Sequence, residues 1–336
     1  LSRSSAASDV YKRQGQLINQ TTVMLNGAVT ATIGILYEFL YDGIFTWFFE
    51  VTDFVGNTYR TGNNTLTIDT TLPIITYIPA TESNGTYFQR DWIFVNVSLN
   101  ETNFDNITFA LYRAGTLLFE NDFSDATRSI NWTLLTDNYY HYNVTVYDLA
   151  NNVNYSITRR ITLDNVDPIV DFGVGTYADG TYLSSDWVYM NASVTEINPD
   201  NSTFSLFNSA HTLASNVTYI MANATSNTTH NFTGYADGLY YYNITVYDRA
   251  GGVASSATRN ITLDDTNPGI LFESATAADD SSFERNWIYA NVSITETNFA
   301  NITFNLYNAS GLVNSTNYTT PCLLYTSPSP RDLYQS

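Results

Sequence analysis

The chain has 336 residues, of which 44% are hydrophobic and 15% aromatic, so it carries enough apolar side chain to bury protein cores. Its 13 basic and 32 acidic residues give a formal net charge of −19, and a field of that sign repels nucleic acid and anionic membranes. The composition argues against a disordered chain and against a nucleic-acid-binding protein. It is compatible with cation binding, with high-salt surroundings or with a soluble surface.

The two ends of the chain differ from the rest. Ser4–Gln14 (SSAASDVYKRQ) and Cys322–Asp332 (CLLYTSPSPRD) resemble translations of the transposase adapters used to build sequencing libraries, read in opposite orientations. We therefore expect residues 1–14 and 322–336 to be non-native scars, and residues 15–321 to be an internal fragment of a longer protein. The only cysteine and the only lysine lie in these ends, so the remaining segment offers no disulfide and no cysteine metal site.

The first strong element in chain order is a predicted strand at Asp42–Asp53, and close copies follow at Asp137–Asp148 and Asp237–Asp248. In the second copy, apolar or aromatic residues occupy every second position: Tyr140, Tyr142, Val144 and Val146. That period predicts a half-buried β-strand. Each copy leads through a turn to a second strand, and a proline follows four residues after the aspartate that ends this second strand: Pro73, Pro168 and Pro268.

Four landmark residues recur in the same register, first 95 and then 100 residues apart. They are a tryptophan (Trp92, Trp187, Trp287), a glutamate (Glu101, Glu196, Glu296), a hairpin aspartate (Asp53, Asp148, Asp248) and a terminal aspartate (Asp69, Asp164, Asp264). The register predicts a partial repeat at 15–72, complete repeats at 73–167 and 168–267, and a truncated repeat at 268–321. Linkers of only a few residues join them.

Each complete repeat is predicted to contain about seven short strands and no helix. In the first complete repeat they are Ile74–Ile78, Trp92–Leu99, Ile107–Tyr112, Thr116–Phe119, Ser129–Leu134, Tyr139–Tyr147 and Ser156–Leu163. The second and third of these should bury their alternate residues: Ile93, Val95, Val97, Leu99, Ile107, Phe109 and Leu111. The pattern predicts an all-β chain of tandem immunoglobulin-like or fibronectin-type β-sandwich repeats of about 95 to 100 residues.

The pattern Val-Tyr-Asp-Leu-Ala-Asn-Asn, followed by Ile-Thr-Leu-Asp-x-x-x-Pro, resembles the tandem Ig-like repeats of bacterial and archaeal cell-surface proteins. The resemblance covers residues 15–321 and implies the fold more directly than a function. The steps Asp137–Tyr140 and Asp237–Tyr240 also resemble a tyrosine corner, in which the tyrosine hydroxyl bonds to the backbone a few residues upstream. Phe45 replaces that tyrosine in the first copy, so its corner must be apolar.

Asn-x-Ser/Thr sequons are the densest signal, because 22 of the 37 asparagines lie in this context. In an exported protein such sites accept bulky, solubilising glycans. The alternative is that Asn-x-Thr is simply the wet face of a strand, since positions i and i+2 share a side. The glycosylation candidates are Asn84, Asn96, Asn106, Asn143, Asn191, Asn201, Asn227, Asn243, Asn291 and Asn301.

Acidic residues recur at predicted strand ends, and calcium takes hard oxygen ligands of this kind. If strand ends meet at a junction between repeats, they bring Glu101, Asp148, Asp164 and Asp167 together. The segment Asp164–Pro168 resembles the interdomain linkers of cadherins, although Asn267 and Leu72 replace its last aspartate in the other copies. The alternative is that Asp148 caps a turn and Glu101 is solvated. The candidate calcium ligands are Glu101, Asp148, Asp164, Asp167, Glu196, Asp248 and Asp264.

The tryptophan strand places Trp92 and Phe94 on the face opposite its aliphatic residues. Such a pair can stack on sugars or on a partner, although a loop or the next module covers it more often. The three histidines occupy unmatched repeat positions, and no paired nucleophile and base, phosphate loop or zinc motif is present, so no catalytic residue is predicted.

The sequence therefore predicts a non-catalytic, structural or adhesive segment of an exported cell-surface protein, such as a stalk, adhesin or surface-layer component. The expected partners are neighbouring repeats, surface-layer proteins or glycans, with membrane contact only through an anchor outside the fragment. No cofactor is required, and calcium is the candidate ion. Two alternatives remain open: ancillary modules of a secreted hydrolase, and calcium-dependent adhesion modules.

Overall fold

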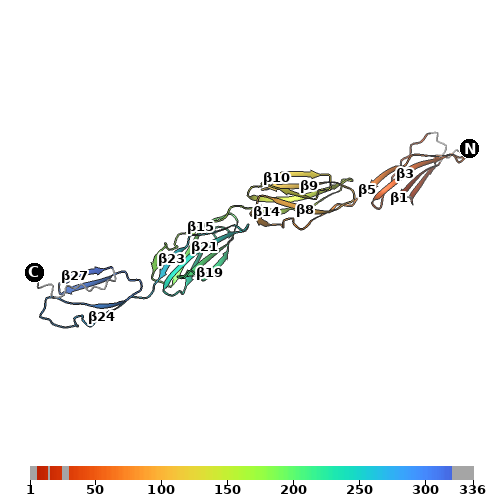
Figure 1. Ribbon diagram of the computed structural model, residues 1–336. Helices are drawn as coiled ribbons and strands as arrows, with labels where there is room; N and C mark the ends of the chain where they lie inside the picture. Colours follow the sequence, from red (N-terminus) through yellow and green to blue (C-terminus); the bar gives the residue numbers. More distant parts are fainter. Residues whose placement is uncertain (1–5, 14–15, 25–29, 320–336) are drawn as a thin grey trace. The chain divides into compact units, whose positions relative to one another are not determined.

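The structure is a computed structural model that describes residues 6–13, 16–24 and 30–319. Every regular element in these residues is a β-strand, as Figure 1 shows, and no helix among them could span a membrane. The chain divides into two compact units, residues 1–166 with 249–252 and residues 167–248 with 253–336, which are described separately. The predicted all-β class of tandem sandwich repeats is confirmed.

The first complete repeat contains nine strands in two sheets. The strands are β6 (Ile74–Tyr77), β7 (Thr86–Phe88), β8 (Ile93–Asn100), β9 (Phe104–Arg113), β10 (Thr116–Phe123), β11 (Ser129–Trp132), β12 (Asn138–Asp148), β13 (Val153–Tyr155) and β14 (Arg159–Leu163). One sheet has the order β10-β9-β12-β14-β7, with β13 also on β12, and the other has the order β11-β8-β6. β7 runs parallel to β14, and the other pairs are antiparallel.

The core of this repeat lies between the two sheets, where alternate residues of β8, β9 and β12 meet. Of the seven residues predicted to be buried, six are at most 2% exposed, and Leu99 packs against them half-buried. Their burial confirms the period-two pattern. The predicted strand Ser156–Leu163 is wrong in its first half, because the chain is irregular between the end of β13 at Tyr155 and the start of β14 at Arg159. In this break the backbone and the hydroxyl of Ser156 both bond to the backbone of Val144. The three-residue strand β7 was not predicted.

The second unit contains the next complete repeat, built in the same order. Its strands are β15 (Ile169–Phe172), β16 (Thr181–Leu183), β17 (Trp187–Thr195), β18 (Pro199–Asn208), β19 (Leu213–Ile220), β20 (Thr229–Thr233), β21 (Gly238–Asp248), β22 (Val253–Ser255) and β23 (Arg259–Leu263). The sheets run β16-β23-β21-β18-β19, with β22 on β21, and β15-β17-β20. The two complete repeats are therefore one architecture.

The last repeat is described only in its first half, which also belongs to the second unit. It holds two antiparallel pairs of strands: β24 (Gly269–Phe272) pairs with β25 (Val292–Thr295), and β26 (Ile302–Asn308) pairs with β27 (Gly311–Tyr318). The predicted scar at 322–336 lies outside the described residues.

The first repeat, in the first unit, is a single sheet in the order β2-β1-β3-β4, with β5 also on β3. Its strands are β1 (Ala6–Arg13), β2 (Gln16–Met24), β3 (Gly43–Thr52), β4 (Thr58–Arg60) and β5 (Asn64–Ile68). β3 pairs with β4 and β5 in the register in which β12 pairs with β13 and β14. β1, which falls in the segment expected to be a scar, takes the place that β9 has beside β12.

Both predicted tyrosine corners are present. The hydroxyl of Tyr140 donates to the carbonyl of Thr136 at 2.7 Å, and that of Tyr240 donates to the carbonyl of Ala236 at 3.0 Å. In the first repeat Phe45 is buried, and its ring lies 4.3 Å from that of Phe39. The corner there is apolar, as its sequence requires.

Candidate functional site

Three carboxylates from strand ends meet where the first repeat joins the second, inside the first unit. Asp69 follows β5, Glu101 follows β8, and Asp148 is the last residue of β12. One carboxylate oxygen of each lies within 4.8 Å of the others. Asp148 is buried and the other two are half-buried. We call Asp69, Glu101 and Asp148 the junction cluster.

Two asparagines connect the members of the junction cluster. Asn103 donates its backbone N–H to Glu101 at 2.6 Å and its side-chain amide to the carboxylate of Asp69. Asn152 donates its side-chain amide to the carboxylate of Asp148 at 2.7 Å and to the carbonyl of Asp69 at 3.0 Å. The end of the first repeat is thus bonded to two loops of the second repeat.

The turn that carries Asp148 is fixed by its own carboxylate. The backbone N–H groups of Ala150 and Asn152 both donate to Oδ1 of Asp148 at 2.8 Å. An aspartate that bonds to backbone groups two and four residues ahead is typical of a tight turn. The sequence alternative, in which Asp148 caps a turn, is therefore correct as far as it goes, and the same side chain also belongs to the cluster.

Three carboxylates at this spacing repel one another. Two unit charges 4.8 Å apart repel by about 1 kcal/mol in water and by about 3 kcal/mol at an effective dielectric constant of 20. The asparagine amides offset part of this, and a cation between the oxygens would offset more. Calcium binds oxygens at about 2.4 Å, so ligands on opposite sides of the ion lie roughly 4.8 Å apart. The donor set and its spacing therefore fit calcium, with further ligands from carbonyls or water.

Part of this arrangement recurs inside the second unit. Asn298 donates its backbone N–H to Glu296 at 2.6 Å and its side-chain amide to Asp264 at 2.8 Å. These contacts correspond to those that Asn103 makes to Glu101 and Asp69. The described part of the last repeat ends before the residue that would correspond to Asp148.

The predicted calcium ligands are not all brought together. Asp164 follows β14, whose end pairs with the start of β12, whereas Asp148 ends β12 ten residues later. At about 3.3 Å per residue, roughly 33 Å separate the two ends of β12, so Asp164 does not join Glu101 and Asp148 of its own repeat. The third member of the junction cluster is instead Asp69, the terminal aspartate of the preceding repeat. Asp69 matches Asp164 in the repeat register, and that match could have identified it from the sequence.

The other predicted ligands lie in the second unit. Glu196 follows β17 and accepts the backbone N–H groups of Ile197 and Asn198 at 2.6 and 2.7 Å. Asp248 ends β21 and is buried, and its backbone pairs with Pro199 across the sheet. Asp264 belongs to the Asn298 contact given above, and Asp167 is an exposed residue that begins the unit.

The sequon asparagines differ in the hydrogen bonds made by the side-chain nitrogen, the atom to which a glycan would be attached. That nitrogen donates to a backbone carbonyl in Asn191 (to Val174, 2.9 Å) and in Asn227 (to Ile220, 2.7 Å). It donates to a neighbouring side chain, over 2.8 to 3.3 Å, in Asn106, Asn143, Asn201 and Asn243. Within the described residues it makes no hydrogen bond in Asn84, Asn96, Asn291 and Asn301.

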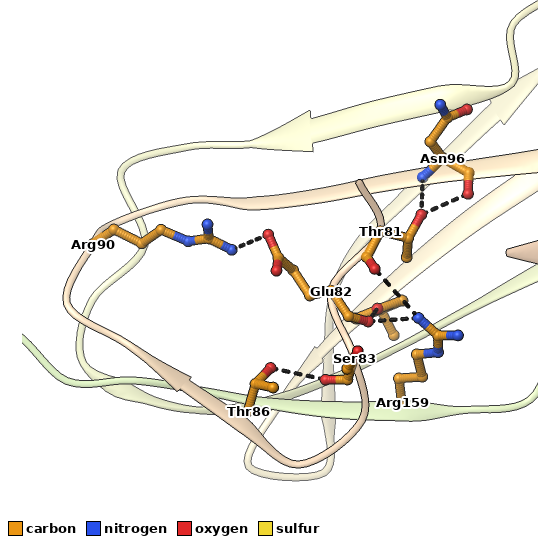
Figure 2. A network of polar contacts seen from close by, with 8 residues as sticks. Thr81, Glu82, Ser83, Thr86, Arg90, Asn96 and Arg159 are labelled. Atoms are coloured by element: carbon orange, nitrogen blue, oxygen red, sulfur yellow. Dashed lines mark hydrogen bonds and ion pairs between the residues drawn. The ribbon is translucent and has the colours of Figure 1, made fainter. Parts of the chain in front are cut away.

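One face of the tryptophan ring at the start of the strand is stacked against an arginine of its own repeat, and Trp92 remains 36% exposed. The guanidinium of Arg90 lies 3.6 Å from the Trp92 ring centroid and 3.9 Å from that of Phe88, and it is ion-paired with Glu82. Figure 2 shows how the loop that carries Glu82 is held: Arg159 donates to the Glu82 carbonyl at 2.6 Å. The guanidinium therefore occupies one face of the ring, and part of the ring remains open to solvent.

The same stacking recurs at the last tryptophan, Trp287, which is 46% exposed. Arg285 lies 3.9 Å from the ring centroids of both Phe283 and Trp287. In the repeat 168–267 Ser185 stands at the position of Arg90 and Arg285. There Trp187 packs against Tyr177, with ring centroids 5.7 Å apart.

The three histidines lie at separate places in the described residues. His141 is half-buried beside Tyr139, His211 stacks on Tyr241 at 4.0 Å, and His230 bonds to the hydroxyl of Tyr219 at 2.9 Å. Burial lowers the pKa of His230 below its usual value. In each case the partner is a tyrosine ring or hydroxyl.

The chain matches no protein-family model, and no curated protein matches it. Among solved structures it is similar to the fibronectin(III)-like modules of Clostridium thermocellum CbhA, with 10% identity, a TM-score of 0.31, and coverage of 56% of this chain and 93% of that one.

Two further structures are similar at the same level. A tetra-tandem repeat from the extending region of a large adhesion protein has 14% identity and a TM-score of 0.37, covering 79% of this chain and 68% of that one. The FN1-FN3 domains of chicken CNTN1 have 12% identity and a TM-score of 0.33, covering 78% and 89%.

Proposed function

We propose that this chain is a structural and adhesive segment of an exported cell-surface protein, in which β-sandwich repeats act as a spacer. The observation that carries the proposal is the bonded junction. Asn103 and Asn152 of one repeat both donate to Asp69 of the repeat before it, so these two successive repeats are connected by more than the linker. A stalk, an adhesin or a surface layer of a bacterial or archaeal envelope would use such connected repeats.

The acidic surface and the many sequons support an extracellular setting, because charge and glycans both keep a crowded surface soluble. The partners proposed are neighbouring repeats, surface-layer proteins or glycans. The proposed role is mechanical spacing with weak lateral contacts, and it needs no catalytic group.

Pulling single molecules of the full chain from its two ends tests the spacer role. We expect two separate unfolding events, one for each complete repeat, because each has its own continuous core. Each event should release roughly 31 to 36 nm of chain, since about 95 to 100 residues extend by about 0.33 to 0.36 nm each. Smooth extension without resolved events would contradict a spacer built from independently folded sandwiches.

We also propose that the junction cluster binds calcium, which would make the connection between repeats depend on the ion. The spacing of the Asp69, Glu101 and Asp148 oxygens favours this second function. Removing calcium would leave three mutually repelling carboxylates held only by hydrogen bonds from Asn103, Ala150 and Asn152, so the junction would loosen first.

Thermal melts of the full chain in calcium and in chelator test this site. Calcium at 100 times its Kd should add about 2.7 kcal/mol to the stability of the folded junction and raise its Tm. Asp69→Asn should remove most of this shift, whereas Asp91→Asn, at an exposed position outside the cluster, should keep it. Identical melts with and without calcium would rule the site out.

A further inference from the structure

Each complete repeat has an open side, where an edge strand of one sheet faces an edge strand of the other. In the repeat 73–167 these edge strands are β10, which pairs with β9, and β11, which pairs with β8. In the repeat 168–267 they are β19, which pairs with β18, and β20, which pairs with β17. Side chains therefore have to hold the two edges together.

A side-chain hydrogen bond crosses the open side in both complete repeats. In the repeat 73–167 the indole N–H of Trp132 on β11 donates to Oδ1 of Asn121 on β10 at 3.0 Å. In the repeat 168–267 the hydroxyl of Tyr219 on β19 and Nδ1 of His230 on β20 form a hydrogen bond at 2.9 Å. We call Tyr219 and His230 the edge pair. Unlike an indole or an amide, an imidazole changes its charge between pH 5 and 8.

The edge pair stands where the repeat 73–167 has two hydrophobic residues. The strand registers match Tyr219 to Phe123 and His230 to Ile130. Phe123 and Ile130 pack against the core of their repeat, and Tyr219 packs against the core of the other. His230 is thus a titratable ring at a position that the same architecture fills with an aliphatic side chain.

The half-buried ring of His230 lies among uncharged groups. Its centroid is 4.4 Å from that of Phe232 and 6.0 Å from that of Phe204, and its cross-strand partner on β17 is the buried Met190. The loop 221–228, which joins β19 to β20, contains no charged residue. Tyr219 is the titratable group that contacts the imidazole from β19.

The nearest strands carry little charge that could compensate a protonated imidazole. In the sequences of β17, β18, β19 and β20 the one charged residue besides the histidine is Asp200, which is exposed and accepts the side-chain amide of Asn201. Burial accordingly lowers the pKa of His230 below its usual value of 6.5. Once the ring is protonated both of its nitrogens are donors, so the Tyr219 hydroxyl can no longer donate to Nδ1.

We propose that the edge pair is an acid-sensitive latch, which ties β19 to β20 at neutral pH and loosens this side of the repeat 168–267 when His230 is protonated. Because the fold lowers the pKa of this histidine, its contribution to stability is complete above pH 6.5 and is lost as the pH falls through the folded-state value. The repeat 73–167, with its Trp132–Asn121 bond, stays closed. The latch does not depend on the spacer role, on calcium or on glycosylation.

Hydrogen exchange of the full chain at pH 8 and pH 5, read by peptide mass spectrometry, tests the latch. After correction for the intrinsic pH dependence of exchange, we expect the protection of amides in β19 and β20 to fall severalfold at pH 5. The matching strands β10 and β11 are the internal control and should change little. An equal response of the two pairs of strands would overturn the proposal.

Tyr219→Phe combined with His230→Ile gives the repeat 168–267 the apolar pair of the repeat 73–167, so the extra fall in β19 and β20 should disappear. The matched control is His211→Asn, which removes an exposed histidine on the loop before β19. Its φ of 58° is one that asparagine tolerates, and this variant should respond to acid like the unaltered chain. A double variant that keeps the full acid response contradicts the latch.

A direct titration of the unaltered chain tests the same inference without any variant. Nuclear magnetic resonance of the imidazole carbons can follow each histidine separately. The pKa of His230 should lie below 6.5, and its signals should shift together with those of the Tyr219 ring, to which it is bonded. A pKa of His230 at or above 6.5 would overturn the proposal, whether or not the double variant folds.

Discussion

At the scale of single residues, one loop carbonyl accounts for much of how a complete repeat is closed. The carbonyl of Glu82 accepts the hydroxyl of Tyr142 at 2.8 Å and the guanidinium of Arg159 at 2.6 Å (Figure 2 shows the arginine bond). In the next repeat the carbonyl of Tyr177 accepts Tyr242 and Arg259, each at 2.8 Å. A buried tyrosine with a bonded hydroxyl holds the loop against the long strand.

Burial raises the pKa of Tyr142 to about 12, above its ordinary value of 10. At a pH between 10 and 12 the Tyr142 hydroxyl is deprotonated in the unfolded chain and still protonated in the folded chain. The contribution of this tyrosine to the free energy of unfolding is therefore complete below pH 10 and falls as the pH rises towards 12. Urea denaturation between pH 9 and 12 should show this decline, and Tyr142→Phe should make it shallower by removing one contributor.

The control for that experiment is Tyr155→Phe at an exposed position, which should leave the decline unchanged. An identical pH profile for the unaltered chain and Tyr142→Phe would mean that this hydroxyl does not contribute. Tyr77, Tyr242 and Tyr240 also have raised pKa values because of burial, so part of the decline should remain in the variant.

At the scale of strands, the long alternating ones could be predicted and the short ones could not. β8, β9 and β12 show a period of two over eight or more residues, so the buried face of each was readable from the sequence. β7 and β13 are three residues long, which is too short for any period to appear. They form because they add to an existing edge, and that is a tertiary effect.

The candidate site was half predictable for a related reason. Glu101 and Asp148 stood out because they recur at strand ends, and the structure places them together. The choice of Asp164 as their neighbour was wrong, because the antiparallel register of β12 and β14 puts that residue at the far end of the repeat. Spacing along the sequence shows that such residues recur, whereas strand register decides which of them meet.

At the scale of the whole molecule, the sequons lie on both sheets of a complete repeat. Asn96 is on β8, and Asn106 and Asn143 are on β9 and β12. Their side chains are half-buried and face away from the core. They therefore lie on the solvent-facing side of their strands, as the alternative interpretation of the Asn-x-Thr pattern requires. A glycan coat on both faces is therefore compatible with the packing inside each sandwich.

Intact mass of the native protein before and after enzymatic deglycosylation tests the coat. We expect a loss of mass. Peptide mapping should find higher occupancy at Asn84, whose side-chain nitrogen makes no hydrogen bond within the described residues, than at Asn227, whose nitrogen is bonded to a backbone carbonyl. Unchanged mass after treatment would remove glycosylation from the description of this protein.

The parallel pairing of β7 with β14 bears on the direction in which a repeat resists load. β7 lies near the start of the repeat and β14 at its end, and three residue pairs join them, from Thr86 with Ile161 to Phe88 with Leu163. Once β6 has peeled away, tension on the two ends drags these strands past each other lengthwise. Their hydrogen bonds must then break together in shear rather than one at a time. β16 and β23 repeat the arrangement, so each complete sandwich contains its own shear clamp along the chain.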